Sequence, residues 1–140
     1  MKILHYSLGL SPYRTGGLTK YSVDLMKSQV NVGQQIFLLF PGHFTFSKKT
    51  KIKQTTLFKG IQVFELINPL PVSLLGGINK PEVFMRTVYP HDVYKSFLEK
   101  IQPDIIHIHT LMGIHKEFFL AAKELNIKVI YTSHDYFGIC

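Results

Sequence analysis

The sequence is poor in the features that mark secreted and membrane proteins. It has one cysteine, Cys140, in 140 residues, so an internal disulfide is excluded and nothing indicates an oxidising compartment. No segment approaches the roughly 18 uninterrupted apolar residues of a membrane span. The N-terminus also lacks the longer apolar segment and cleavage site of a signal peptide. We therefore expect a cytoplasmic protein.

Acidic residues are scarce as well. Nine Asp and Glu stand against sixteen Lys and Arg, which gives a formal net charge of +7. Such a balance suits nucleic acid, an anionic membrane surface or phosphorylated ligands, because all three attract cations in the same way. Hydrophobic residues make up 46% of the chain and charged ones only 18%, which excludes a disordered chain and predicts one compact domain over residues 1–140.

The apolar pattern predicts strands and helices in alternation. Short apolar runs that end in Gly, Pro or polar residues indicate strands, and apolar residues three and four positions apart indicate helices. The expected strands are 2–6, 35–40, 61–67, 104–109 and 128–132, and the expected helices are 18–33, 91–101 and 113–126. This order is typical of an α/β fold: a Rossmann-like, doubly wound parallel sheet in a three-layer αβα arrangement. Ligands of such sheets lie outside the carboxyl ends of the strands.

Two segments read as loops. Residues 43–59 are polar and carry Lys48, Lys49, Lys51, Lys53 and Lys59, which indicates an exposed basic loop. Residues 68–81 are rich in Pro and Gly and predict a long surface loop.

The basic loop supports one alternative function, a non-catalytic module that binds an anionic surface. With Phe44, Phe46, Leu74 and Leu75 nearby, the lysines could contact an anionic membrane. Nucleic acid is disfavoured as a partner because no recognition motif accompanies the charge.

The pair Gly16 and Gly17 lies between the first expected strand and the first helix. Unpaired backbone N–H groups and the helix dipole favour an anion there, and glycines let the backbone approach a phosphate. The pattern matches neither the dinucleotide nor the P-loop fingerprint. The alternative is a turn that needs positive φ. Arg14, in the same loop, is either a ligand for an anionic group or a solvated side chain.

Histidines supply the other candidates. His134 and Asp135 follow the last strand and place a titratable pair at the crevice, with a strand-capping pair as the alternative. His107 and His109 are two positions apart and share one face of a strand. With His134 and Asp135 they could form a metal site, so a metal-dependent hydrolase is a further alternative. For His107 we favour a core histidine hydrogen-bonded to a neighbour.

Four motifs occur together in the chain: Lys-Ile-Leu-His opening a strand, Ser-Pro-Tyr-Arg-Thr-Gly-Gly-Leu before a helix, Pro-Asp-Ile-Ile-His-Ile-His, and Tyr-Thr-Ser-His-Asp-Tyr-Phe-Gly. In this order the sequence resembles the N-terminal domain of family 4 glycosyltransferases of the GT-B fold, over essentially all 140 residues. The resemblance implies retaining transfer of a sugar from a nucleotide-diphosphate donor to a hydroxyl acceptor, in a cleft between two Rossmann-like domains. It implies no obligatory metal or cofactor. Bacterial surface-polysaccharide or glycolipid synthesis is the setting that it suggests.

The resemblance also implies roles for individual residues. Gly16 and Gly17 would approach the donor diphosphate, and His134 would lie near the transferred sugar. Arg14, His109 and Asp135 would line the acceptor side. No donor-binding second domain follows residue 140 in this sequence, so we expect an acceptor-side half that is inactive alone. Lipid-linked acceptors would bring it to the inner face of the membrane.

Overall fold

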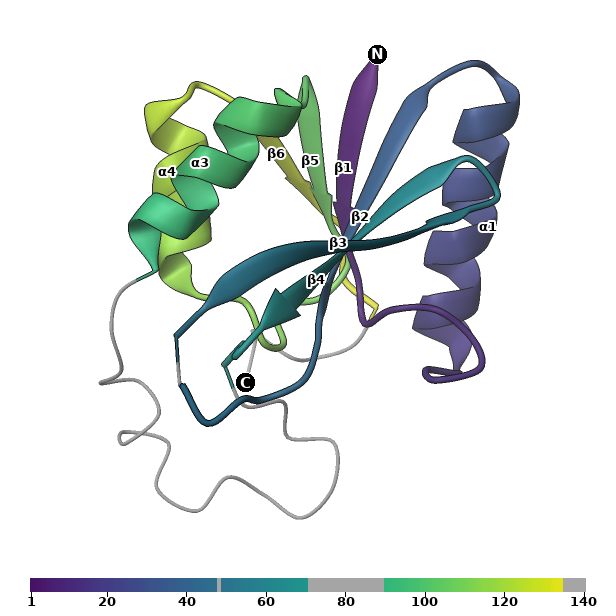
Figure 1. The fold of residues 1–140 in the computed structure, drawn as a ribbon. Coiled ribbons are helices and arrows are strands. Elements are labelled where there is room, and N and C mark those ends of the chain that lie inside the picture. The colour runs from purple at the N-terminus through teal and green to yellow at the C-terminus, as the bar shows by residue number, and fades with distance from the viewer. Residues whose placement is uncertain (48, 71–89, 135–140) are drawn as a thin grey trace.

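The computed structural model describes residues 1–47, 49–70 and 90–134. A six-stranded sheet forms the middle layer, with helix α1 on one face and helices α3 and α4 on the other (Figure 1). The elements are β1 (Lys2–Tyr6), α1 (Gly17–Asn31), β2 (Gln35–Pro41), β3 (Lys51–Phe58), β4 (Ile61–Ile67), α3 (His91–Ile101), β5 (Ile105–Ile108), α4 (Lys116–Glu124) and β6 (Lys128–Tyr131).

The strand order is β3-β4-β2-β1-β5-β6. Five strands run parallel and only β3 is antiparallel to its neighbour β4. The predicted α/β, Rossmann-like fold class is therefore confirmed. Since β1 lies between β2 and β5, the segments that follow these strands meet at one edge of the sheet, where a ligand is expected.

The structure corrects the prediction for residues 43–59. Half of this segment is not a loop but strand β3, which pairs with β4 along its length apart from an irregularity between Gln54 and Leu57. Its side chains are exposed or half-buried throughout, so no apolar alternation revealed it. Lysines on an edge strand discourage pairing with other chains, which explains the charge. Lys48 and nearly all of the expected loop 68–81 lie outside the described residues.

The third helix is also shorter than expected. It begins at Lys116 rather than 113, because Gly113 takes a φ of 79° that a helix cannot continue through.

Alternating side chains on the strands build two different cores. On the α3 and α4 face, Leu4, Phe37, Phe64 and Ile106 belong to one large apolar cluster with both helices. On the α1 face a smaller cluster includes Ile3, Ile36, Leu38, Ile61, Val63 and Met26. Toward β5, the same face also carries His5 and His107, which are register partners.

Candidate functional site

The start of α1 is open and uncapped. Gly16 is the N-cap residue with a φ of 123°, and no side chain hydrogen-bonds to the cap. This φ confirms the turn interpretation for Gly16, since only glycine adopts it readily. A Cβ on Gly17 would meet no atom within 4 Å, so the first turn faces open space. The two readings of the glycine pair are compatible: the turn leaves the backbone N–H groups of the first turn accessible.

Basic side chains surround this helix start. A cavity of about 450 Å³ is lined by Arg14, Gly16, Gly17 and Lys20, and further along α1 by Asp24 and Lys27, which pair with each other. The first turn of α1 contains no acidic residue. The positive end of the helix dipole and the cationic side chains therefore both attract an anion here.

Four histidines gather near α1, on or shortly after strands β1, β5 and β6. His5 comes from β1, His107 from β5, His109 directly follows β5, and His134 follows β6. His5 and His107 are register partners on adjacent parallel strands, so they share the α1 face with His109. The ring centroids of His107 and His109 are 4.2 Å apart, and those of His5 and His109 are 5.2 Å apart.

Three of these histidines form a hydrogen-bonded chain that starts on helix α1. The Gln29 Oε1 atom is 2.7 Å from His5 Nε2. His5 Nδ1 is 2.9 Å from His109 Nε2, and His109 Nδ1 is 3.3 Å from His134 Nε2. The side chains of His5 and His109 are buried, so this chain connects the interior to the sheet edge.

Burial keeps the inner histidines neutral. Desolvation lowers the pKa of His5 to about 4 and that of His109 to about 3, and the neighbouring imidazoles add to the effect. A neutral imidazole has one N–H, and the carbonyl oxygen of Gln29 can only accept. His5 therefore donates from Nε2 to Gln29 and accepts at Nδ1 from His109, which in turn accepts at Nδ1 from His134. In the neutral form of His134, this order leaves Nδ1 as an acceptor for a ligand.

His107 has a separate partner. Its Nε2 atom lies 2.8 Å from Thr132 Oγ1, and burial lowers its pKa. The hydrogen bond expected for His107 is present, but its side chain is half-buried rather than part of the core.

Sequence reasoning missed His5. A signal was present, because a doubly wound sheet places its first strand beside the strand 104–109, and His5 then faces His107. The predicted metal set of His107, His109 and His134 needs correcting accordingly. Among the described residues, the grouped ligand atoms are those of His5, His107 and His109, all within 4.8 Å of one another. His134 contacts the other nitrogen of His109, and Asp135 lies outside the described residues.

Tyr21 connects the histidines to the helix start. It belongs to the second turn of α1, and its ring centroid is 4.9 Å from that of His134 and 6.0 Å from that of His109. The rings of Tyr21, His109 and His134 therefore form a triangle in which each lies near the other two. The open helix start and the histidine chain share one edge of the sheet.

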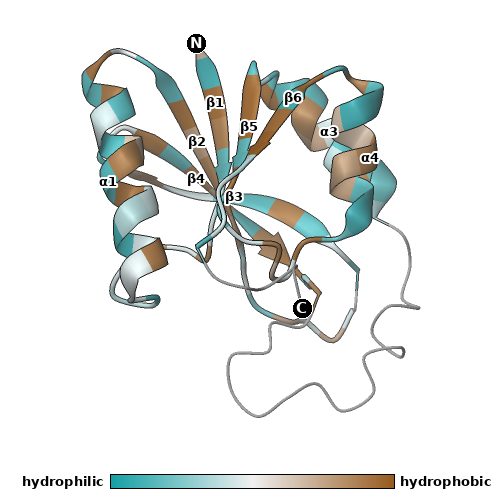
Figure 2. Ribbon diagram, turned by 180° about the vertical axis from the view of Figure 1, so that it is seen from behind, coloured by the Kyte–Doolittle hydropathy of each residue, from teal (hydrophilic) through white to brown (hydrophobic). Residues whose placement is uncertain are grey.

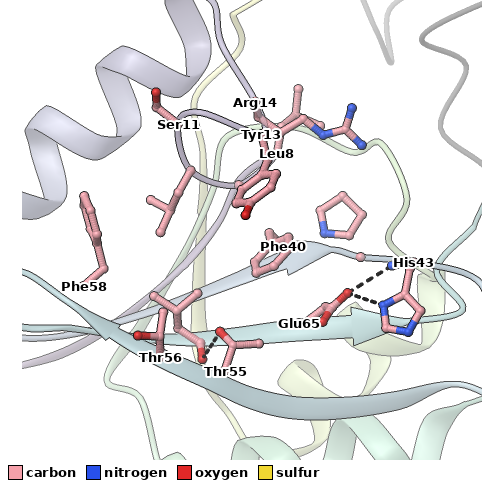
Figure 3. Close-up of a pocket in the computed structure, with 15 residues that line it drawn as sticks. Leu8, Ser11, Tyr13, Arg14, Phe40, His43, Thr55, Thr56, Phe58 and Glu65 are labelled. Atoms are coloured by element: carbon pink, nitrogen blue, oxygen red, sulfur yellow. Dashed lines mark hydrogen bonds and ion pairs between the residues drawn. The ribbon is translucent and has the colours of Figure 1, made fainter.

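A larger cavity, of about 750 Å³, opens on the other side of the loop 7–16 (Figure 3). Loop residues Leu8, Tyr13 and Arg14 lie on one side of it and strand residues such as Phe40 on the other. Arg14 lines both cavities, so it is placed to contact a ligand in either.

A histidine and a carboxylate meet in this cavity. The His43 side chain pairs through Nδ1 with Glu65 Oε1 at 2.6 Å, and the His43 backbone N–H donates to the same oxygen at 3.1 Å. A Cβ on Gly42 would collide with Glu65, so glycine is required for this approach. Sequence reasoning missed the pair, although both residues lie at the carboxyl ends of predicted strands.

The membrane alternative depends on surface residues. Phe44 and Phe46 are exposed, near the basic strand β3, whereas Leu74, Leu75 and Lys48 lie outside the described residues. Within the described ranges, no helix has the length and apolarity needed to cross a bilayer.

Comparisons with known proteins show likeness at the level of the fold. No protein-family model matches the sequence, and no curated protein matches it. Among solved structures, the chain is similar to sucrose-phosphate synthase from Thermosynechococcus elongatus, with a TM-score of 0.50 and 14% sequence identity. The match covers 96% of this chain and 33% of the synthase. The chain therefore has a glycosyltransferase-like, Rossmann-type fold, and it spans about a third of the length of this neighbour.

Proposed function

We propose that this chain is the N-terminal, acceptor-side domain of a retaining glycosyltransferase that moves a sugar from a nucleotide-diphosphate donor to a hydroxyl acceptor. One observation carries the proposal: an uncapped helix start with basic neighbours and the half-buried His134 lie at the same edge of the sheet, and Tyr21 of α1 contacts His134. The fold shared with a glycosyltransferase supports the class of reaction. Family 4 membership and retention are parts of the proposal.

Donor binding is assigned to the start of α1. When the glycosidic bond to the diphosphate breaks, negative charge develops on the leaving oxygen. The N–H groups near Gly16 and Gly17 would stabilise that charge, with Arg14 and Lys20 adding positive potential. No divalent ion is then required to hold the diphosphate, and transfer should proceed without added Mg²⁺ or Mn²⁺.

His134 is assigned to the transferred sugar. Its Nδ1 acceptor, positioned by the hydrogen-bonded chain behind it, would accept a hydrogen bond from a sugar hydroxyl and orient the ring for attack. His109 is buried and would act through His134. Its acceptor-side role, like that of Asp135, stays a prediction.

The acceptor is assigned to the cavity of Figure 3. Apolar walls including Leu8 and Phe40 can contact the faces of a sugar ring or a lipid-proximal group, and Arg14 and the His43–Glu65 pair offer polar contacts to hydroxyls. An acceptor in surface-polysaccharide or glycolipid synthesis, used at the cytoplasmic face of a membrane, suits this mixture.

Under this proposal the chain is part of a longer transferase, and the test is sugar transfer by that protein. His134→Ala should lower kcat by about 100-fold, since it removes a hydrogen-bonding group that positions the sugar. The melting temperature is measured alongside, because His109 Nδ1 loses its partner in this variant, and turnover is compared well below the melting temperature of both proteins. His91→Ala is the matched control: His91 lies on α3, across the sheet from α1, and its activity should equal that of the wild type. Normal turnover in His134→Ala would refute the assignment.

Membrane contact is a second, compatible proposal. Exposed Phe44 and Phe46 beside Lys49 and Lys51 form an apolar and cationic surface, the combination that binds anionic bilayers. Phe44→Ser/Phe46→Ser should reduce co-sedimentation with vesicles containing anionic lipid. Leu120→Ser, on the exposed side of α4, is the control. Binding that is indifferent to anionic lipid, or unchanged in the double variant, would refute this proposal.

A further inference from the structure

His5, His107 and His109 offer three imidazole nitrogens that lie close together. The nitrogens lie within 4.8 Å of one another, on the α1 face of two adjacent strands. His5 and His109 are buried, and His107 is half-buried. The space between the three rings is therefore bordered by two buried side chains and by one that solvent can reach. Neutral imidazoles on a rigid sheet are suitable ligands for first-row divalent metals.

Each of the three rings has its other nitrogen engaged. Nε2 of His5 contacts Gln29 Oε1, Nε2 of His107 contacts Thr132 Oγ1, and Nδ1 of His109 contacts His134 Nε2. Metal-bound histidines nearly always have such a partner for the second nitrogen, which fixes the ring and the tautomer. Three histidine nitrogens within 4.8 Å of one another, on rings that each have a hydrogen-bond partner, are the features expected of a metal centre.

We propose that His5, His107 and His109 bind one Zn²⁺ ion between β1 and β5. Zinc–nitrogen distances of about 2.0–2.1 Å in a tetrahedral site place the ligand nitrogens roughly 3.4 Å apart. The present 2.9 Å between His5 Nδ1 and His109 Nε2 would have to widen by a few tenths of an ångström, which rotation of the two rings provides. The fourth position would hold water.

The ion lies behind His134 rather than in contact with a sugar or diphosphate. It would cross-link β1 to β5, and through Gln29 it would also fix α1. It would reverse the hydrogen bond to His134 as well: with Nε2 of His109 on the metal, the proton of His109 sits on Nδ1 and is donated to His134 Nε2. The outward Nδ1 of His134 then becomes a donor. Zinc occupancy would thus determine whether His134 donates to a ligand or accepts from it.

The test measures zinc uptake and needs no transfer activity, so it is independent of the proposed function. Untagged protein carrying Cys140→Ser, which removes the sole thiol, is stripped with a chelator and titrated with Zn²⁺ by calorimetry. We expect one equivalent to bind. His5→Gln and His107→Gln should each weaken binding by at least about tenfold. His43→Gln and His91→Gln, which alter histidines outside the cluster, should bind as the parent does.

A second measurement covers variants that fail to fold. Co²⁺ added to the parent protein should give the absorption of a four-coordinate site with nitrogen ligands, and one equivalent of Zn²⁺ should remove it. Zinc should also raise the melting temperature of the parent. Absence of a bound equivalent, or equal uptake by His5→Gln and His107→Gln when both are folded, would overturn the proposal. So would a Co²⁺ spectrum without nitrogen ligands.

Discussion

The two faces of the sheet differ in what they bury. Toward α3 and α4, sixteen buried residues form one apolar cluster, and the strands contribute Leu, Ile, Phe and Tyr. Toward α1, six buried apolar residues form a smaller cluster on the side of β2 and β4, and the side of β1 and β5 holds His5, His109, Ser7 and Ser22. Figure 2 shows the sheet and the helices on its two faces, turned by 180° from Figure 1 and coloured by hydropathy. The same strands therefore supply a stabilising core on one face and a polar site on the other.

Buried polar groups are tolerated on the α1 face because they have partners. Ser7 and Ser22 contact each other at 2.9 Å, and His5 uses both of its nitrogens. Partnered polar groups contribute little net stability, but the loss of one partner is costly. The α1 face should consequently be sensitive to pH and to hydrogen-bond deletions, and the α3–α4 face to loss of volume.

The largest effect is expected from a cavity in the α3–α4 face. Phe118 is fully buried and packs edge-on against Tyr94, with ring centroids 5.3 Å apart. Phe118→Ala should lower the free energy of unfolding by about 3–5 kcal/mol, measured by urea denaturation. Leu120→Ala, two positions along α4 and half exposed, should cost less than about 1 kcal/mol. Equal costs for the two variants would show that this face is not the main source of stability.

Acid should act mainly on the α1 face. The pKa of His5 is lowered to about 4 and that of His109 to about 3, against 6.5 in the unfolded chain. Between these values the unfolded chain binds more protons than the folded one, so stability is complete above pH 6.5 and falls as the pH drops. From pH 7 to pH 5 the metal-free protein should lose between about 2 and 4 kcal/mol from the pair.

The control for the acid effect is a comparison of variants in the presence of chelator. His5→Gln/His109→Gln should show a smaller difference in unfolding free energy between pH 7 and pH 5, whereas His91→Gln should keep the full difference. Equal stability of the wild type at the two pH values would contradict the neutral, buried state of these histidines.

An intermediate effect is expected where α1 meets the histidines. Gln29→Leu keeps the size of the side chain but removes the acceptor of the His5 Nε2–H group. A buried donor without a partner costs about 1–3 kcal/mol of unfolding free energy. Ser28→Ala, on the exposed side of the same helix turn, should change stability by less than about 0.5 kcal/mol. A cost for Gln29→Leu as small as that of Ser28→Ala would indicate that water satisfies His5.

The difference between the faces also explains what the sequence could predict. Runs such as 35–40 are apolar on both sides of the strand, so the parallel strands and the fold class follow from local pattern. Strand β3 has no buried face, and its lysines resemble a solvated loop, so the pattern alone could not distinguish the two.

The site residues could be predicted from the sequence only where their placement depends on a single strand. The spacing of His107 and His109 places both on one face of a strand, and the structure agrees. His5 and Glu65 depend on which strands are neighbours and in what register, and that information is absent from any single segment. The chain from Gln29 to His134 joins four elements, so its order could be found only after the sheet was assembled.

The smallest effect is expected when one of two hydrogen-bonded, buried hydroxyl groups is removed. Ser22→Ala should lower the free energy of unfolding by about 1 kcal/mol, because the buried Ser7 hydroxyl loses its contact with Ser22 Oγ at the end of β1. Ser7→Ala/Ser22→Ala removes both hydroxyls and leaves no orphan, so the double variant should cost less than the sum of the single variants. A double-mutant cycle in urea measures this difference. Strict additivity would show that the two hydroxyls do not depend on each other, and the α1 face would then tolerate polar groups by some means other than pairing them.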